Sequence, residues 1–277
     1  MTARLSLNQA TIKRATLAEA IAATIGAGIP AIGLWRDPVA ELGLTRVVQA
    51  VKDSGLRVSS LCRGGFFTAE PGPVRDAALD DNRRALDEAA ALGAPALVLV
   101  AGGLPAGSRD LVAARARVAD ALEALVPHAA QTGVALAIEP LHPMYAADRA
   151  VVSTLDQALD LAAPFPAEQV QVVIDAFHVW WDPTLATAIA RAGRERRIAC
   201  YQACDFVTPI APDALLSRGI PGDGHIDFAH LTGLVNDAGY RGDVEVEVFR
   251  QEVWDAPAAE VAARVADAHR RLVAPYL

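Results

Sequence analysis

The chain has 277 residues, 53% of them hydrophobic and 21% charged, which is enough apolar material for a large buried core and unlike a disordered protein. Its net charge of -8 opposes attraction to phosphate backbones and anionic lipid, so neither nucleic acid nor a membrane is expected as a partner. No apolar stretch reaches the roughly 18 residues that span a bilayer, and the start of the chain lacks a signal-peptide core, so a cytoplasmic protein is expected.

The first half of the chain alternates short apolar segments with amphipathic, alanine-rich segments, which indicates strands followed by helices. The predicted strands here are 5–11, 31–36, 57–63 and 96–102. The predicted helices here are 16–28, 75–93 and 111–133. Several of these helices end in glycine just before the next strand, as helix C-caps do.

The second half repeats the same unit, with predicted strands at 135–140, 170–177, 197–205 and 243–249 and a last helix at 257–277. Eight strand-helix units with right-handed crossovers can close into a barrel. A doubly wound open sheet would carry a glycine-rich nucleotide turn after its first strand, and "NQATIK" is no such turn. With no linker and no shift in composition, we predict an α/β fold, a (β/α)8 TIM barrel forming one domain over 1–277.

The cysteine spacing and the residues at the strand ends indicate where chemistry can occur in this chain. Cys62, Cys200 and Cys204 have no CxxC spacing, so we expect reduced, buried thiols rather than disulfides or a sulfur-bound zinc. In a barrel of this kind the functional groups lie at the carboxyl ends of the strands. Several predicted strands do end on polar or aromatic residues, among them Trp35 and Arg63.

Two strands end on acids that alternation directs into the barrel. In 243–249, the valines share one face, so Glu245, Glu247 and Phe249 point toward the axis, with Glu247 nearer the carboxyl end. In 135–140, Glu139 shares its face with two small alanines. A carboxylate inside a barrel is costly unless it binds a cation, and the alternative to a metal ion is a lysine or arginine partner in the lumen.

The stretch "QVVIDAFHVWW" places Asp175 at the end of another strand and His178 three residues later. Positions three apart on a strand face opposite sides, so His178 joins Asp175 only if the chain has already turned. We expect Trp180 and Trp181 to wall the resulting pocket, and packing beneath a loop is the alternative.

Glu139, Asp175 and Glu247 would together form an oxygen-rich site for one divalent ion such as Mg²⁺ or Mn²⁺. A fourth ligand is expected from 197–205, where the chain offers Gln202 and Asp205. This requires carboxylates that are close together and are not neutralised by arginine.

The segments "IEP", "DAFH", "YQACD", "GDGHIDF" and "VEVEVF" resemble the sugar phosphate isomerase/epimerase family of xylose isomerase-like TIM barrels. The resemblance runs over nearly the whole chain and implies one divalent metal ion (Mn²⁺, Mg²⁺, Co²⁺ or Zn²⁺) on Glu139, Asp175, position 202 and Glu247. It also implies that His178 and Arg218 bind the substrate. Gln202 stands where the family has a histidine, and an amide oxygen is a weaker ligand, which leaves metal identity and affinity open.

Further substrate-binding candidates lie at the same predicted rim. They are Arg63, beside two glycines that allow close approach of the backbone to a ligand, and His142, Trp35 and Trp181. Bracing a loop is the alternative for the arginines, and ordinary hydrogen bonding for His142. His128 and His269 fall within predicted helices and are expected to be exposed.

These residues lead to a functional hypothesis: a metal-dependent isomerase or epimerase of a small sugar or sugar phosphate. Glu139 and Glu247 would remove and return the proton beside a carbonyl through a metal-stabilised enediolate. A hydride shift stays open. The alternatives are a dehydratase of a keto-polyol at the same site, a related endonuclease, which the few histidines oppose, and a catalytically silent sugar-binding barrel, which Gln202 favours. Relatives of this kind suggest a homodimer or homotetramer.

Overall fold

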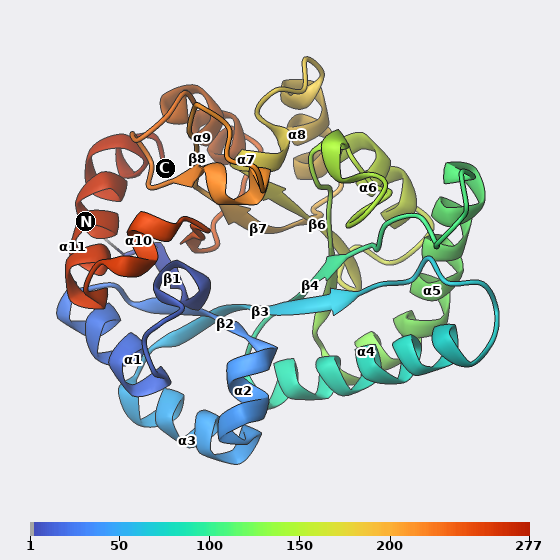
Figure 1. Cartoon of the computed structure of the whole chain (residues 1–277), viewed down its shortest axis with the longest axis horizontal. Helices are drawn as coiled ribbons and strands as arrows, with labels where there is room; N and C mark the ends of the chain where they lie inside the picture. Colours follow the sequence, from blue (N-terminus) through green and yellow to red (C-terminus); the bar gives the residue numbers. More distant parts are fainter. Residues whose placement is uncertain (1–2) are drawn as a thin grey trace.

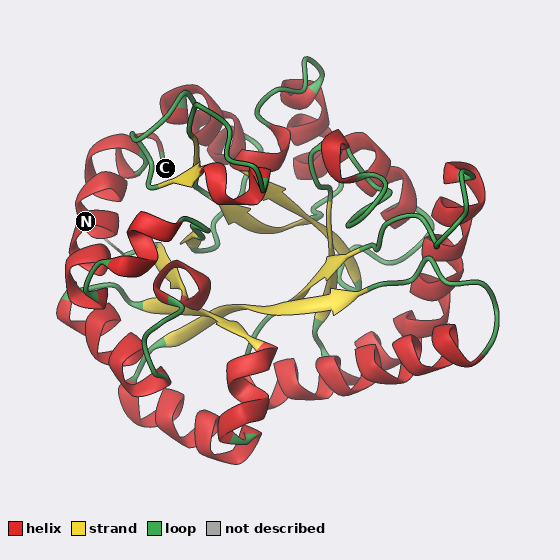
Figure 2. Ribbon diagram, viewed as in Figure 1, coloured by secondary structure: helices red, strands yellow, loops and turns green. Residues whose placement is uncertain are grey.

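Eight parallel strands form a closed barrel, and helices surround it (Figure 1, Figure 2). This computed structural model describes residues 3–277. The strands of the barrel follow the order β1-β10-β7-β6-β5-β4-β3-β2, while β8 and β9 pair antiparallel outside it. The predicted (β/α)8 TIM barrel is confirmed, and each of the eight predicted strands contributes to it.

The strands are short, as is usual for this fold. Their bounds are β1 (Leu5–Asn8), β2 (Ala31–Trp35), β3 (Arg57–Gly65), β4 (Ala96–Val100), β5 (Ala135–Glu139), β6 (Val170–Asp175), β7 (Ile198–Gln202), β8 (Asp205–Phe206), β9 (Arg218–Gly219) and β10 (Val244–Val246).

The helices include the predicted ones and several short ones. The α-helices are α1 (Leu17–Gly26), α2 (Arg36–Leu42), α3 (Leu44–Ser54), α4 (Pro73–Leu92), α5 (Leu111–Thr132), α6 (Leu155–Ala162), α7 (Ala176–Val179), α8 (Leu185–Arg194), α9 (Phe228–Asp237), α10 (Gln251–Asp255) and α11 (Ala258–Leu272). The 3-10 helices are η1 (Gln9–Ile12), η2 (Pro143–Tyr145), η3 (Ala214–Ser217) and η4 (Ala274–Tyr276).

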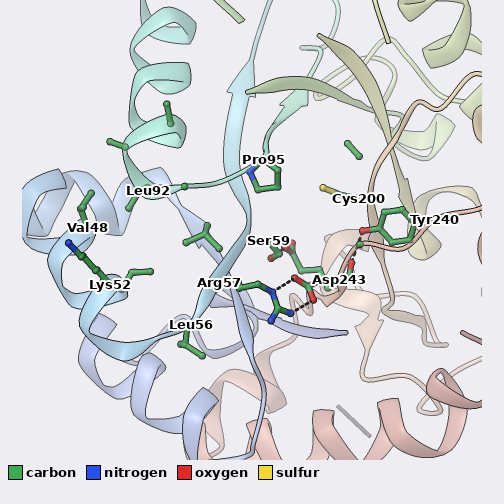
Figure 3. A pocket seen from close by; sticks show the side chains of 18 residues that line it. Val48, Lys52, Leu56, Arg57, Ser59, Leu92, Pro95, Cys200, Tyr240 and Asp243 are labelled. Carbon is green, nitrogen blue, oxygen red and sulfur yellow. Dashed lines mark hydrogen bonds and ion pairs between the residues drawn. The ribbon is translucent and has the colours of Figure 1, made fainter. Parts of the chain in front are cut away.

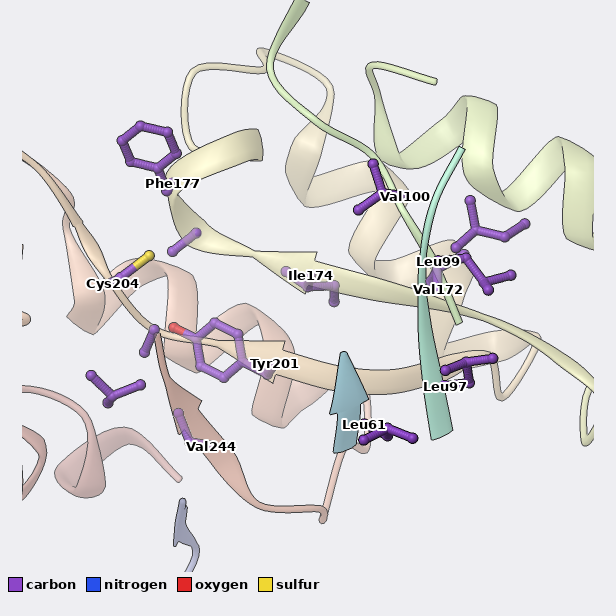
Figure 4. Packing of buried hydrophobic residues seen from close by; sticks show 14 of the residues in the cluster. Leu61, Leu97, Leu99, Val100, Val172, Ile174, Phe177, Tyr201, Cys204 and Val244 are labelled. Atoms are coloured by element: carbon purple, nitrogen blue, oxygen red, sulfur yellow. The ribbon is translucent and has the colours of Figure 1, made fainter. Parts of the chain in front are cut away.

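Strand alternation divides the core into an outer and an inner part. Leu97 and Leu99 of β4 belong to the large cluster between strands and helices, part of which Figure 4 shows. Val98, between them, faces the barrel interior together with Ala135 and Ala137. Small residues at those positions leave room beneath Glu139, as the alternation predicted.

Local signals explain where the helices begin and end. Thr16 and Glu19 form a capping box at the start of α1, and Gly93 and Gly133 take left-handed backbone at the ends of α4 and α5.

The three cysteines are free and buried, as expected. Within residues 3–277, no helix is both long and apolar enough to cross a membrane.

Candidate metal centre

A cavity of about 460 Å³ opens at the carboxyl ends of the strands. Its lining combines acids, cations and aromatic rings from six different strands or the loops after them. Among the lining residues are Trp35, Arg63, Phe66, Glu139, Asp148, Arg149, His178, Arg218, Glu247 and Phe249. The candidate site therefore lies where the fold predicts it.

Three carboxylates converge beneath this cavity. Glu139 ends β5, Asp175 ends β6, and Glu247 follows β10 by one residue, and all three are buried. Ligand atoms of Glu139, Asp175 and His178 lie within 4.8 Å of one another, close enough to hold one metal ion. This trio contains two of the predicted ligands, Glu139 and Asp175, and adds His178, while the predicted ligand Glu247 lies outside it.

The burial of these acids changes their protonation. Burial, and then the negative charges of Asp175 and Glu247, raise the pKa of Glu139 well above its ordinary value. Burial raises the pKa of Glu247 to about 8, although the Arg218 cation pulls it down. Both groups therefore hold a proton more tightly than an exposed glutamate does, which suits proton transfer near neutral pH.

Arg218 meets the acids directly, as the alternative to a metal ion anticipated. Its Nη1 lies 2.8 Å from Asp175 Oδ2 and 3.2 Å from Glu247 Oε2, and its side chain is only 2% exposed. The guanidinium also lies between the rings of Phe177 and Phe249, at 4.9 and 5.1 Å from their centroids. Two of the three acids are thus ion-paired to arginine in this structure, contrary to the requirement stated for the predicted site.

The β8–β9 hairpin carries Arg218 to the acids. Asp205, which opens β8, accepts hydrogen bonds from the backbone amides of Phe206, Gly222, Gly224 and Ile226 at 2.8–2.9 Å. One buried carboxylate therefore ties both arms of the loop together. Asp205 was, with Gln202, a candidate for the fourth metal ligand, but its two carboxylate oxygens instead accept from four backbone amides. The available signal for this role was an acid followed by the glycine-rich segment 219–224.

His178 joins Asp175 because the chain turns immediately after β6. Asp175 caps α7 by accepting from the Phe177 amide, and His178 lies on that helical turn. Burial, and then the nearby Arg218 charge, lower the pKa of His178 well below its ordinary value, so the ring is neutral. Its Nδ1 faces the His142 amide at 3.2 Å and its Nε2 faces Arg218 Nη2 at 2.9 Å.

Gln202 ends β7 beside Asp175, and Glu245 fixes the orientation of its side-chain amide. Its Nε2 donates to Glu245 Oε1 at 3.0 Å, and the same carboxylate accepts from Asn8, Ser59 and Ser60. With its nitrogen fixed by an acceptor, Gln202 keeps a buried Oε1 that has no hydrogen-bond partner among the described residues. An unpaired carbonyl oxygen next to Asp175 fits the fourth ligand of an oxygen-rich divalent ion site.

The remaining predicted residues fall into two groups. Trp35 and Arg63 line the cavity, and Arg63 lies over the Phe66 ring at 4.8 Å. His142 and Trp181 contact each other ring to ring, and Trp181 Nε1 donates to the His178 carbonyl, so they brace the turn that carries His178.

The exposure of Trp180 and His269 differs from what the sequence led us to expect. Trp180 is 36% exposed and packs on Phe206, which matches the loop-packing alternative rather than a pocket wall. His269 was expected to be exposed, and that prediction is wrong: it faces the core from α11 and is buried. His128 is partly exposed and bonds Asp87.

A second cavity, of about 630 Å³, lies at the opposite end of the barrel (Figure 3). Apolar side chains of α3 and α4 line it together with Tyr240 and the Arg57–Asp243 ion pair. Glu245 borders this cavity as well, so the polar layer of Gln202 and Glu245 separates the two ends of the barrel interior.

Comparison with known proteins supports the fold. The family described as xylose isomerase-like TIM barrel matches residues 20–272. A protein from Sinorhizobium meliloti 1021 is 48% identical, with a TM-score of 0.95 over 99% of both chains. IOLI protein with a bound zinc atom is 21% identical, with a TM-score of 0.85 over 99% of both chains.

An epimerase is also similar in structure. D-psicose 3-epimerase with D-tagatose, from Clostridium cellulolyticum H10, is 15% identical, with a TM-score of 0.78 over 98% of this chain and 99% of that one. At such identities the likeness shows a shared fold. A search among curated proteins found no match.

Proposed function

The chain belongs to the xylose isomerase-like TIM barrel family, and from this premise we propose that it is a divalent-metal-dependent isomerase or epimerase of a sugar or sugar phosphate. The observation that carries the proposal is the set of three buried carboxylates at the cavity floor, two of them with raised pKa values. Structural neighbours that include a zinc-containing protein and a sugar epimerase support it.

In this proposal Glu139, Asp175, Gln202 and Glu247 hold the ion. A bound divalent ion would neutralise the negative charge that develops on the substrate's carbonyl oxygen as the neighbouring carbon loses its proton. Glu139 and Glu247 approach from different strands, so one carboxylate removes that proton and the other returns it, to the opposite face of the carbon or to the adjacent carbon. The first outcome is epimerisation and the second is isomerisation.

The cavity also supplies groups that would bind and orient the substrate. His178 is neutral and can donate to or accept from a sugar hydroxyl, and Arg63 offers a cation at the mouth. The rings of Trp35 and Phe249, 5.6 Å apart, form an apolar wall on which a sugar face can rest. His142 and Trp181 would act indirectly, by holding the loop of His178.

The test is to incubate the Mn²⁺-loaded protein with a panel of aldoses and ketoses in heavy water. We expect deuterium at the carbon beside the carbonyl of the product, detected by NMR and mass spectrometry. Glu139→Gln and Glu247→Gln should each lower the rate by about 10²-fold or more, since each removes an acid–base group.

Glu252→Gln is the matched control, because Glu252 is an exposed surface acid on α10 and should leave the rate unchanged. Product without deuterium would point to a hydride shift instead. Product lighter by one water would identify a dehydratase. Wild-type rates in both active-site variants would refute the proposed roles.

One observation favours a second candidate, a catalytically silent sugar-binding barrel. Arg218 neutralises Asp175 and Glu247, and Gln202 is a weaker ligand than the family's histidine. For this candidate the panel would give binding by calorimetry with no product and no exchange.

A further inference from the structure

Arg218 is one cation beside three buried acids. One guanidinium serves Asp175 and Glu247, with Glu139 beside them, so three acids share one cation at the floor of the cavity. The pairing is direct on Nη1, which also touches the Glu247 carbonyl and Cys204 Sγ at 3.2 Å each. A divalent ion on the same acids would have to compete with this nitrogen for the same oxygens.

The arrangement around Arg218 leaves hydrogen-bonding groups unsatisfied. Its Nε is buried and has no hydrogen-bond partner among the described residues. Its Nη2 and the His142 amide both face ring nitrogens of His178, and both are groups that can only donate. A neutral imidazole accepts through one nitrogen and donates through the other, so only one of these contacts can be a hydrogen bond.

Binding of one divalent ion would satisfy several of these groups together. The unpaired Oε1 of Gln202 would gain a partner, and so would Asp175 Oδ2, which the guanidinium contacts without a well-directed hydrogen bond. His178, with Arg218 withdrawn, would keep the His142 amide on Nδ1 and carry its proton on Nε2. That N–H would then face the cavity and be free to donate to a substrate hydroxyl.

We propose that Arg218 is an exchangeable counter-cation, which pairs with Asp175 and Glu247 in the metal-free protein and must leave them when a divalent ion enters. The inference rests on the metal site of the proposed function. It makes metal binding and the position of Arg218 thermodynamically linked. Any interaction that holds the guanidinium on the acids lowers their affinity for the metal ion. Conversely, metal binding releases the guanidinium into the substrate cavity. Arg218 thus competes with the ion for the acids and sets how tightly the ion binds.

The test compares Mn²⁺ affinity in wild type, Arg218→Met and Arg149→Met by isothermal titration without substrate. Arg218→Met should bind Mn²⁺ at least about tenfold more tightly, because a cation in contact with carboxylates depresses their proton affinity by a comparable factor. Arg149 lines the same cavity but pairs with Asp148 and Asp213, so Arg149→Met removes an equal charge without touching the acids and should change the affinity much less.

Melting in chelator and in excess Mn²⁺ gives a second measure. Metal-free Arg218→Met should melt lower than wild type, since it leaves buried acids without a cation, and excess Mn²⁺ should raise its melting temperature by more than that of wild type. If that variant does not fold, Arg218→Lys and a crystal structure of wild type with Mn²⁺ replace it. In that crystal structure Arg218 Nη1 should lie more than about 4 Å from Asp175.

The outcomes separate this inference from the proposed function. Equal or weaker Mn²⁺ binding by Arg218→Met, or Arg218 still paired with Asp175 in the Mn²⁺ complex, would overturn the exchange. Mn²⁺ binding by the variant but not by wild type would support the exchange and refute a metal-dependent activity. If neither protein binds Mn²⁺, both proposals are refuted. Tight Mn²⁺ binding by the variant, with no product formed by wild type from the sugar panel, supports the exchange alone.

Discussion

At the scale of single residues, His269 is a buried polar side chain that could make the protein sensitive to pH. It is on α11 with 1% exposure, and neither ring nitrogen has a hydrogen-bond partner among the described residues. Burial lowers its pKa to about 4, and the positive charge of Arg4 makes a smaller contribution in the same direction. The folded protein therefore holds this imidazole neutral, while the unfolded chain protonates it at an ordinary value.

This histidine makes the protein sensitive to acid. Because the pKa in the folded state lies below that of the unfolded state, the unfolded chain binds more protons as the pH falls below 6.5. The stability is full above that pH and is lost progressively toward pH 4, by up to about 3 kcal/mol. Urea unfolding at neutral pH and at about pH 5 should show a smaller loss for His269→Leu than for wild type.

The exposed His230→Gln is the control for that experiment and should keep the wild-type loss on acidification. An identical loss in His269→Leu would show that other groups cause the acid sensitivity.

At the scale of elements, the end of β3 shapes the mouth of the candidate site. Asn82 of α4 clamps Gly65 with two hydrogen bonds, accepting from its amide and donating to its carbonyl. Gly65 has a φ of 112°, and a Cβ there would lie 1.9 Å from the Val100 carbonyl oxygen. Only glycine allows β3 to approach β4 so closely while directing Arg63 toward the cavity.

Gly65→Ala should therefore cost much more stability than an ordinary glycine substitution. Gly55→Ala is the matched control, since Gly55 also has a positive φ of 72° but has open space around its Cα. We expect a loss of about 1 kcal/mol for Gly55→Ala and of at least about 4 kcal/mol for Gly65→Ala, measured by urea unfolding. Similar losses in the two variants would contradict the close-approach argument.

Elements with a clear hydrophobic period could be predicted from the sequence, and elements held by distant contacts could not. The eight barrel strands follow from short apolar runs between turn residues, and the long helices from their apolar faces. The β8–β9 hairpin has only two residues in each strand, and its shape depends on Asp205 binding amides up to 21 residues away. The hydrophobic periodicity of neighbouring residues does not predict such a long-range interaction.

The same limit applies to the candidate site. Alternation places Glu139 and Glu247 in the barrel, because a strand end and a side-chain face can be read from neighbouring residues. The pairing of Arg218 with Asp175 depends on how a long loop folds back, and neither residue type nor spacing determines that. The sequence supplied the possibility of an arginine partner, and the structure identified which arginine.

At the scale of the whole molecule, closure of the barrel joins the two ends of the chain. β1 pairs with β10, and Thr11 accepts from the Val248 amide and donates to the Val246 carbonyl. Trp254 of α10 donates its indole N–H to the Ala10 carbonyl across 244 residues of sequence. These few contacts hold the seam that makes one closed sheet of the strands.

Trp254→Phe should weaken the seam, because it leaves the buried Ala10 carbonyl without its donor while keeping most of the apolar volume. We expect a loss of about 1–2 kcal/mol in the free energy of unfolding, measured by urea denaturation. Trp180→Phe is the control, since Trp180 is partly exposed, and should cost about 0.5 kcal/mol or less. If Trp254→Phe lost no more stability than Trp180→Phe, the indole hydrogen bond would contribute little to closure of the barrel.

The hairpin that carries Arg218 has a consequence for how such barrels diverge. The acids lie on or next to strands whose positions the whole sheet fixes, whereas the arginine lies on a loop that the Asp205 carboxylate helps to fasten. Lengthening or shortening that loop would shift the positive charge relative to an unchanged acidic floor. One ancestral scaffold could thereby yield descendants that differ in ion preference and substrate charge without a single altered acid.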